Sequence, residues 1–215
     1  MSKSLIKRLL ISLCFMLLLG NAYSVNNSIH DSLKNDDFFQ KKKLGFAYDF
    51  ALTQQNLLYE YETYKPQLFQ LIYSYSLTKE NRKNFWGINI IPQINSVVIT
   101  NKFHESHDFE FGTNVEVSFN HIVGKRVLFF VAIGTGPHYI SHNRGRQAGG
   151  FLFSDNFIAG IRYKLDEDYE FKLHIKFRHM SNANLKLPNW GINNWMVGFT
   201  FLKNFNLFAR KASVN

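Results

Sequence analysis

Residues 169–181 read YEFKLHIKFRHMS, and apolar and polar side chains alternate along nearly all of this stretch. The apolar parity holds Tyr169, Phe171, Leu173, Ile175 and Phe177, and the other parity holds Glu170, Lys172, His174, Lys176 and Arg178. Side chains of a β-strand point alternately to opposite faces, so the stretch predicts a strand with one apolar and one charged face. Such a strand belongs either to a membrane barrel with a polar lumen or to a soluble sheet with one solvated face.

The same alternation recurs along the chain, between polar turns and with almost no helical periodicity. We expect eight strands, at residues 44–53, 68–78, 85–99, 108–121, 126–139, 151–165, 169–181 and 192–205. Pro92 suggests a bulge or strand end in the third. The strand at 126–139 is apolar on both parities, so the pattern does not orient it.

Large aromatic and branched side chains alternate with small, polar and charged ones, which is the pattern of barrels that are apolar outside and polar inside. A soluble lipocalin-like barrel would show the inverse. Aromatic residues make up 16% of the chain and Phe alone numbers 22, too many for the thin core of a small soluble barrel. We therefore predict an all-β fold, an eight-stranded antiparallel transmembrane β-barrel of the bacterial outer membrane.

The N-terminal residues have the composition of a secretory signal. Lys3, Lys7 and Arg8 precede an apolar run at 9–19, and small residues follow at 22–24. This order predicts a cleaved signal peptide at 1–24. The alternative, an uncleaved anchor helix, would need about 20 apolar residues. We then expect a flexible periplasmic segment at 25–42, the barrel at 43–208 and a C-terminal tail at 209–215.

Charge and cysteine content narrow the chemistry. The single cysteine, Cys14, lies in the predicted signal peptide, so the exported chain would have no disulfide or thiol chemistry. The net charge of +9 includes Lys3, Lys7 and Arg8 of the predicted signal peptide, so the exported chain would carry +6, which suits a protein that binds anionic lipid or polysaccharide. Nucleic acid is not an expected partner, because the protein leaves the cytoplasm.

Connection lengths predict which end of the barrel faces outwards. The connections at 79–83, 122–125 and 166–168 are short, as periplasmic turns are, and those at 54–67, 100–107, 140–150 and 182–191 are longer, as outer loops are. The strand at 169–181 then ends near the outer leaflet.

His179 and Ser181 form a candidate catalytic pair at that strand end. Side chains two residues apart on a strand share a face and lie about 6.5–7 Å apart, so an imidazole can reach a serine hydroxyl. Nucleophilic acyl chemistry uses this pairing. Both residues have the parity of the apolar face, which suits an enzyme that attacks lipid from within a membrane.

The residues after the pair extend a recognisable pattern. His-x-Ser-Asn-Ala at 179–183 and Pro-Asn-x-Gly-Ile at 188–192 resemble the outer-membrane lipid A 3-O-deacylases of the PagL family. Those proteins are eight-stranded barrels with a lipid-facing serine hydrolase site. The close match covers residue 179 to about 193, and the rest of the chain agrees in length, signal peptide and strand count.

The resemblance implies a role for each residue of the motif. Ser181 would be the nucleophile, and His179 would be the general base and then the acid for the leaving hydroxyl. Asn189 and backbone N–H groups around Ala183 and Asn184 would stabilise the oxyanion, and Asn182 would shape that turn.

The chain departs from the family at the third member of the triad. The best-known members have a glutamate fourteen residues after the histidine, and this chain has Asn193 there. By parity Asn193 lies on the apolar face of the last strand. An asparagine can hold an imidazole tautomer, as in Cys-His-Asn proteases, but it cannot stabilise an imidazolium by charge. We expect a Ser-His-Asn site, with an inactive descendant as the alternative.

We therefore expect a monomer, or alternatively a dimer, that hydrolyses an acyl ester of lipid A in lipopolysaccharide, by resemblance the 3-O ester. No metal or organic cofactor is implied. The rival hypotheses are a structural or adhesive barrel with a decayed site and an esterase that acts on another acyl ester. A small porin is disfavoured, because side chains fill the interior of an eight-stranded barrel.

Other polar residues are weaker candidates. His104 and His107 with Glu105 suggest either a metal site or a solvated loop, and Ser141 and His142 are adjacent, so on a strand they would face opposite sides. Three basic residues would either contact lipid A phosphates or keep the outer loops soluble: Arg144, Arg146 and Lys186. Trp86, Trp190 and Trp195 suit an interfacial belt, and His174 suits the lumen.

Overall fold

The computed structural model describes residues 42–52, 55–56, 63–77, 83–100, 105–141, 147–166 and 168–205. The predicted signal peptide at 1–24, the segment 25–42 except for Lys42, and the predicted tail at 209–215 lie outside the described residues. Within the described ranges, no helix has the length and hydrophobicity needed to cross a membrane.

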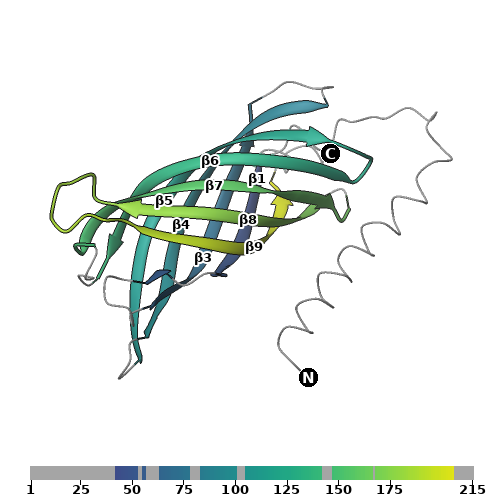
Figure 1. The fold of residues 1–215 in the computed structure, drawn as a ribbon. Coiled ribbons are helices and arrows are strands. Elements are labelled where there is room, and N and C mark those ends of the chain that lie inside the picture. The colour runs from purple at the N-terminus through teal and green to yellow at the C-terminus, as the bar shows by residue number, and fades with distance from the viewer. Residues whose placement is uncertain are drawn as a thin grey trace, which may run out of the picture. The chain divides into compact units, whose positions relative to one another are not determined.

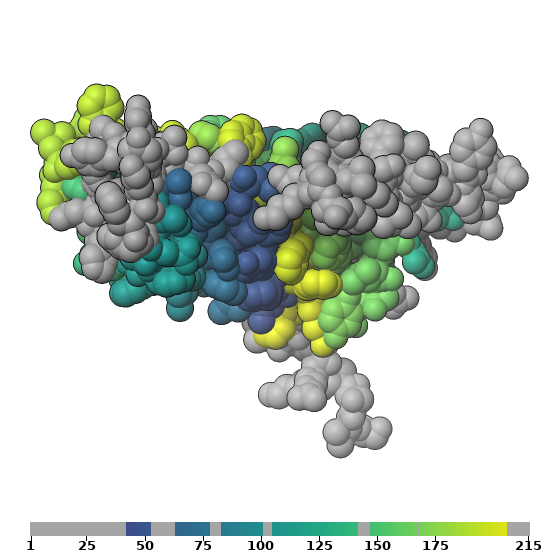
Figure 2. Space-filling model, turned by 60° about the horizontal axis from the view of Figure 1, so that its bottom comes forward, coloured from purple at the N-terminus to yellow at the C-terminus, as the bar shows by residue number. Residues whose placement is uncertain are grey.

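Eight long antiparallel strands close into a barrel, which confirms the predicted fold class (Figure 1). They are β1 Lys43–Ala51, β3 Thr63–Ser76, β4 Asn84–Thr100, β5 Glu105–Ile122, β6 Val127–Ile140, β7 Gly150–Lys164, β8 Tyr169–Ser181 and β9 Ile192–Asn204, and the short β2 Gln55–Asn56 pairs with β3. Each long strand pairs with its neighbours in the chain, and β1 pairs with both β3 and β9. Figure 2 shows β1 between these two strands in the wall. Closure satisfies the backbone groups that an open sheet edge would leave unpaired.

Two strands begin three or more residues earlier than the sequence pattern predicts. β3 begins at Thr63 rather than at residue 68, and β5 begins at Glu105 rather than at residue 108. In β3, the buried side chain of Tyr64 adds interior contacts that favour the longer strand. Pro66 obscures the pattern there but is tolerated, because pairing with β1 ends at the adjacent Gln67, where a missing amide hydrogen is least costly.

The charged parity of β8 lines the interior, as predicted. Glu170, Lys172, His174, Lys176 and Arg178 are all buried, and four of them pair with charged residues of other strands. Arg178 Nη2 lies 2.7 Å from Glu110 Oε2, Asp49 accepts hydrogen bonds from His174 and Lys176, and Glu170 pairs with Lys43 and Arg162. Pairing is what makes burial of these charges tolerable.

The interior is not uniformly polar. Leu128 and Phe130 of β6 pack inside with Phe85 and Ile158, which explains why the 126–139 segment is apolar on both parities. A second apolar cluster fills the end where the long loops lie; it consists of Tyr64, Val97, Ile99, Ile140, Leu152, Met180 and Ile192. We call this end the loop end. Apolar packing there gives the last residues of β8 and the first of β9 a fixed position.

Candidate active site on the outward-facing wall

His179 and Ser181 lie on the outward-facing wall at the loop end of β8. Both are partly exposed, whereas Met180 between them is fully buried in the apolar cluster. Strand alternation and burial of Met180 therefore hold the two polar side chains on the same outer face. In the part of the chain that the structure describes, the side chains of Ser181 and His179 form no hydrogen bond with each other.

Asn193 of β9 lies directly opposite His179 in the strand register. The Nδ1 atom of His179 lies 2.6 Å from the Oδ1 atom of Asn193. A carbonyl oxygen only accepts, so this contact requires a hydrogen on Nδ1 and leaves the lone pair on Nε2. An imidazole in that tautomer can accept a proton from a neighbouring hydroxyl through Nε2.

Gly191 makes room for the imidazole. A Cβ atom at this position would lie 2.5 Å from Cε1 of His179 and 3.3 Å from each ring nitrogen. Gly191 also has φ of +75°, a conformation that residues with a side chain rarely adopt. The glycine is thus required both by the backbone and by the closely placed ring.

The loop between β8 and β9 is held by its asparagines. Asn189 Oδ1 accepts from the backbone N–H of Asn182 at 2.9 Å, and Asn189 Nδ2 donates to Asn184 Oδ1 at 2.9 Å. Asn182 Nδ2 donates to the carbonyl of Lys186 at 2.7 Å. Ala183 and Asn184 have φ of 52° and 63°, so the chain turns sharply directly after Ser181. The motif residues predicted as support therefore gather beside the serine.

Gln147, which the sequence analysis did not identify, ties this loop to the neighbouring one. Its fully buried side chain accepts a hydrogen bond from Gly191 N at 3.1 Å, and its backbone forms an isolated bridge with Asn189. The backbone N–H of Ala148 donates to the carbonyl of Pro188 at 2.8 Å. No local pattern marks Gln147, because its partners are about forty residues away in sequence.

Two further polar residues lie beside His179 on the same wall. Asp155 of β7 is opposite His179 in the register, on the side away from Asn193, and Thr135 of β6 is opposite Asp155. Thr135 Oγ1 donates to Asp155 Oδ1 at 2.6 Å. The sequence contains a signal that could have identified Asp155. This residue has the same strand parity as Phe153 and Phe157, where an apolar side chain is expected instead of a charged one.

The remaining candidates have other surroundings. His174 is buried inside the barrel against Asp49, and Trp86, Trp190 and Trp195 are exposed. His107 Nε2 lies 3.6 Å from Glu105 Oε1 in an exposed pair, and Ser141 bonds to the carbonyl of Phe109. Lys186 is exposed in the β8–β9 loop. Four residues lie outside the described ranges: His104, His142, Arg144 and Arg146. The described part of the chain has no group of three side chains suited to hold a metal ion.

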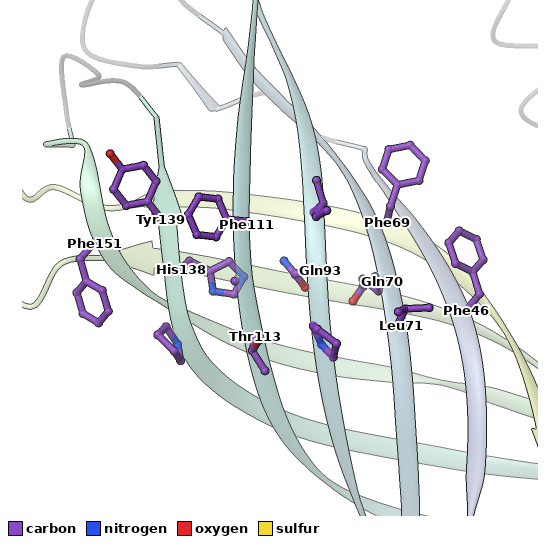
Figure 3. A pocket seen from close by; sticks show the side chains of 14 residues that line it. Phe46, Phe69, Gln70, Leu71, Gln93, Phe111, Thr113, His138, Tyr139 and Phe151 are labelled. Atoms are coloured by element: carbon purple, nitrogen blue, oxygen red, sulfur yellow. The ribbon is translucent and has the colours of Figure 1, made fainter. Parts of the chain in front are cut away.

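A groove of about 690 Å³ lies elsewhere on the wall, across β1 and β3 to β7. Figure 3 shows Phe46 and Phe69 on one side and Phe111, Tyr139 and Phe151 on the other, with Gln70, Gln93 and His138 between them. Pro92 and Pro137 line it, and paired registers are interrupted near both prolines, in β3–β4 and β5–β6. The groove contains none of the predicted catalytic residues.

A protein-family model and a solved structure agree with this architecture. The model of the family described as lipid A 3-O-deacylase (PagL) matches residues 34–201. Comparison with curated proteins gives no significant match. Among solved structures, the crystal structure of the outer membrane enzyme PagL is 15% identical with a TM-score of 0.52, over 74% of this chain and 97% of that chain. The outer membrane protein OprG from Pseudomonas aeruginosa is 10% identical with a TM-score of 0.48, over 78% of this chain and 97% of that chain.

Proposed function

We propose that this chain, which belongs to the lipid A 3-O-deacylase (PagL) family, is an outer-membrane serine esterase that removes the 3-O-linked acyl chain of lipid A. The observation that carries the proposal is the contact of 2.6 Å between His179 Nδ1 and Asn193 Oδ1. Both residues lie on the apolar outward-facing wall, and His179 is two positions before Ser181 in β8. A polar pair with a defined tautomer is unexpected on such a wall unless it has a function.

In the first step, Ser181 Oγ attacks the carbonyl carbon of the ester while Nε2 of His179 takes its proton. Asn193 holds the hydrogen on Nδ1, so that Nε2 is the basic atom. The carbonyl oxygen becomes an oxyanion. The imidazolium then gives its proton to the departing sugar hydroxyl, and the acyl group remains bound to Ser181.

The oxyanion would be held by donors in the turn after Ser181. Asn189 Nδ2 donates one hydrogen to Asn184 and has a second hydrogen for the substrate. Backbone N–H groups of Ala183 and Asn184 are the further donors that we propose, because their positive φ values turn the chain sharply beside the serine. Donors fixed in place before reaction stabilise developing charge without reorganisation.

In the second half-reaction, His179 takes a proton from water, and the resulting hydroxide attacks the acyl carbonyl of Ser181. The bond to Ser181 Oγ breaks, Oγ regains its proton from the imidazolium, and a free fatty acid leaves. The products are lipid A with one chain fewer and the fatty acid, and the cycle needs no oxidant or metal.

The surroundings of the site suit a lipid substrate in the outer leaflet. The outward-facing wall is rich in exposed aromatic side chains, among them Phe157 and Trp195 near the site. The β8–β9 loop exposes Leu187 to 77% and Trp190 to 68%, next to the basic Lys186. Apolar side chains beside a cation match the acyl chains and phosphates of lipid A. We propose the orientation in which this loop lies on the outer side.

Mass spectrometry of lipid A tests the function. Cells that express the wild-type chain are compared with cells that express Ser181→Ala at equal levels of folded outer-membrane barrel. We expect the loss of one hydroxyacyl chain in the wild type alone, and the mass of the released acid identifies the ester. Equal lipid A spectra from the two strains would contradict the proposal.

Asn193 favours one alternative, a barrel whose site has lost activity, because an asparagine lacks the charge of the glutamate found in the best-known relatives. An esterase specific for another acyl ester would instead release a different acid. The same spectra separate these cases: no Ser181-dependent change indicates an inactive barrel, and a Ser181-dependent loss of a secondary chain or of a phospholipid acyl chain indicates another bond.

A further inference from the structure

Four polar residues form a straight row across the outward-facing wall. Thr135 pairs with Asp155, Asp155 with His179, and His179 with Asn193, on the adjacent strands β6, β7, β8 and β9 (Figure 1). Each has the outward parity of its strand. The row connects the predicted general base to a carboxylate that the family motif does not include.

The carboxylate of Asp155 is out of place on this wall unless it has a partner. Phe153 and Phe157, its neighbours on the same face, are exposed aromatic residues. Among the described acidic residues, the other one with outward parity is Glu105, at the loop end of β5, where it pairs with His107. An ionisable side chain that faces hydrocarbon is costly and is most often functional. Thr135 supplies a hydrogen bond of 2.6 Å but no charge.

The other groups around the imidazole leave a need for negative charge. Asn193 and Ser181 are neutral, and Gly191 presents only backbone. Arg178, the adjacent residue in β8, turns its side chain inwards and pairs with Glu110, and Lys186 in the loop is exposed and basic. When His179 takes the serine proton it becomes a cation, and none of these groups stabilises it by charge.

We propose that Asp155 is a positioning residue for His179, supplying the negative charge that stabilises the imidazolium, while Asn193 fixes the tautomer. Directly opposed residues of antiparallel strands have Cβ atoms about 4.5–5.5 Å apart, so opposite charges there attract strongly in a medium of low dielectric constant. Asp155 of β7 and Asn193 of β9 would thus share the two tasks that a single glutamate performs in the best-known family members. This inference rests on the proposed deacylase function.

The test moves the carboxylate from one side of His179 to the other. We compare the purified wild type with Asp155→Asn, Asp155→Glu and the double variant Asp155→Asn/Asn193→Asp, using lipid A in detergent micelles as the substrate. We expect Asp155→Asn to lower kcat by about 10- to 100-fold with little change in KM. Asp155→Glu and the double variant should recover most of the loss, because each restores one carboxylate beside the imidazole.

Glu105→Gln is the matched control. It removes the other described carboxylate with outward parity, which pairs with His107 rather than lying opposite His179, so its kcat should stay within about threefold of the wild type. Unchanged kcat in Asp155→Asn would overturn the proposal. So would failure of the double variant to recover activity while it is folded, as judged by the gel mobility of the unheated barrel.

A second measurement does not depend on catalysis. Diethyl pyrocarbonate reacts with an imidazole nitrogen, so the rate of this reaction reports on the groups around the His179 ring. At one fixed pH, the rate of His179 modification should therefore differ between Asp155→Asn and the wild type, as measured by mass spectrometry of the peptide that contains it. Equal rates would contradict the proposal. If the wild type and Ser181→Ala both release no fatty acid but the modification rates differ, the deacylase function fails and the Asp155–His179 coupling remains.

Discussion

Gly191 lies so close to the imidazole of His179, at the loop end of the barrel, that a Cβ atom on Gly191 would be 2.5 Å from Cε1 of the ring. The ring is therefore in contact with the backbone at the beginning of β9, on the same side as its partner Asn193. In this position of the ring, Nδ1 lies 2.6 Å from Asn193 Oδ1. A change at Gly191 should affect catalysis through the position of the base.

Gly191→Ala should lower kcat by about 100-fold, since displacement of a catalytic group by about 1 Å has an effect of this size. The positive φ of 75° at Gly191 adds backbone strain for alanine. Gly150, with φ of +100° and open space around it, is the matched control, because alanine there has the strain without the clash. If both variants lose equal activity in a steady-state deacylation assay, the imidazole contact is not the cause.

Asn193→Ala should lower kcat by about 10- to 100-fold, because the imidazole loses the acceptor that selects its tautomer. Asn193→Glu keeps an acceptor and adds charge, so its activity should equal or exceed that of the wild type. Asn194, the next residue, is buried inside the barrel. The variant Asn194→Ala therefore tests whether any substitution in this part of β9 lowers activity. Wild-type kinetics of Asn193→Ala would show that Asn193 is not the third member of the site.

Gln147→Ala should impair catalysis more than stability. The side chain of Gln147 accepts a hydrogen bond of 3.1 Å from Gly191 N, and its loss frees the loop that carries Asn189. Gln147→Glu retains an accepting oxygen and should keep most of the activity. The measurements are kcat together with the urea midpoint of the barrel in micelles. A fall in the midpoint that accounts for all of the lost activity would argue for a purely structural role.

Arg178→Met should destabilise the barrel by about 3–5 kcal/mol, because it leaves the buried carboxylate of Glu110 without its cation. The double variant Arg178→Met/Glu110→Gln removes both charges and should recover a large part of this loss. Denaturant unfolding in lipid vesicles gives the free energies. Equal stability of the single variant and the wild type would mean that water or another cation already compensates Glu110.

The sequence predicted the site residues that lie close together in the chain. His179 and Ser181 follow from strand parity, and Asn193 follows from the motif and from the parity of the last strand. The structure places His179 and Asn193 in direct contact. The roles of these residues in catalysis stay predictions, as does the support expected from Asn182, Ala183, Asn184 and Asn189.

The residues that sequence analysis missed are brought to the site by contacts between segments that are far apart in the chain. Asp155 lies opposite His179 only because β7 and β8 pair with one particular offset, and a shift by one residue would turn it inwards. Gln147 reaches Gly191 across two loops. The beginning of β3 at Thr63 was missed because Pro66 and Lys65 conceal the alternation that Tyr64 continues.

The sequence by itself determined the closed barrel, its polar and apolar faces, and the position of the His-x-Ser pair at a strand end. These properties follow from a period of two residues, which is a local property of the chain. Only the tertiary structure decided which further side chains flank the pair. The offset between β7 and β8 places Asp155 opposite His179, and a contact between two loops brings Gln147 to Gly191, although these residues are 24 and 44 positions apart in the chain. It also decided where ion pairs and apolar clusters lie inside the barrel, since side chains from different strands fill one shared interior.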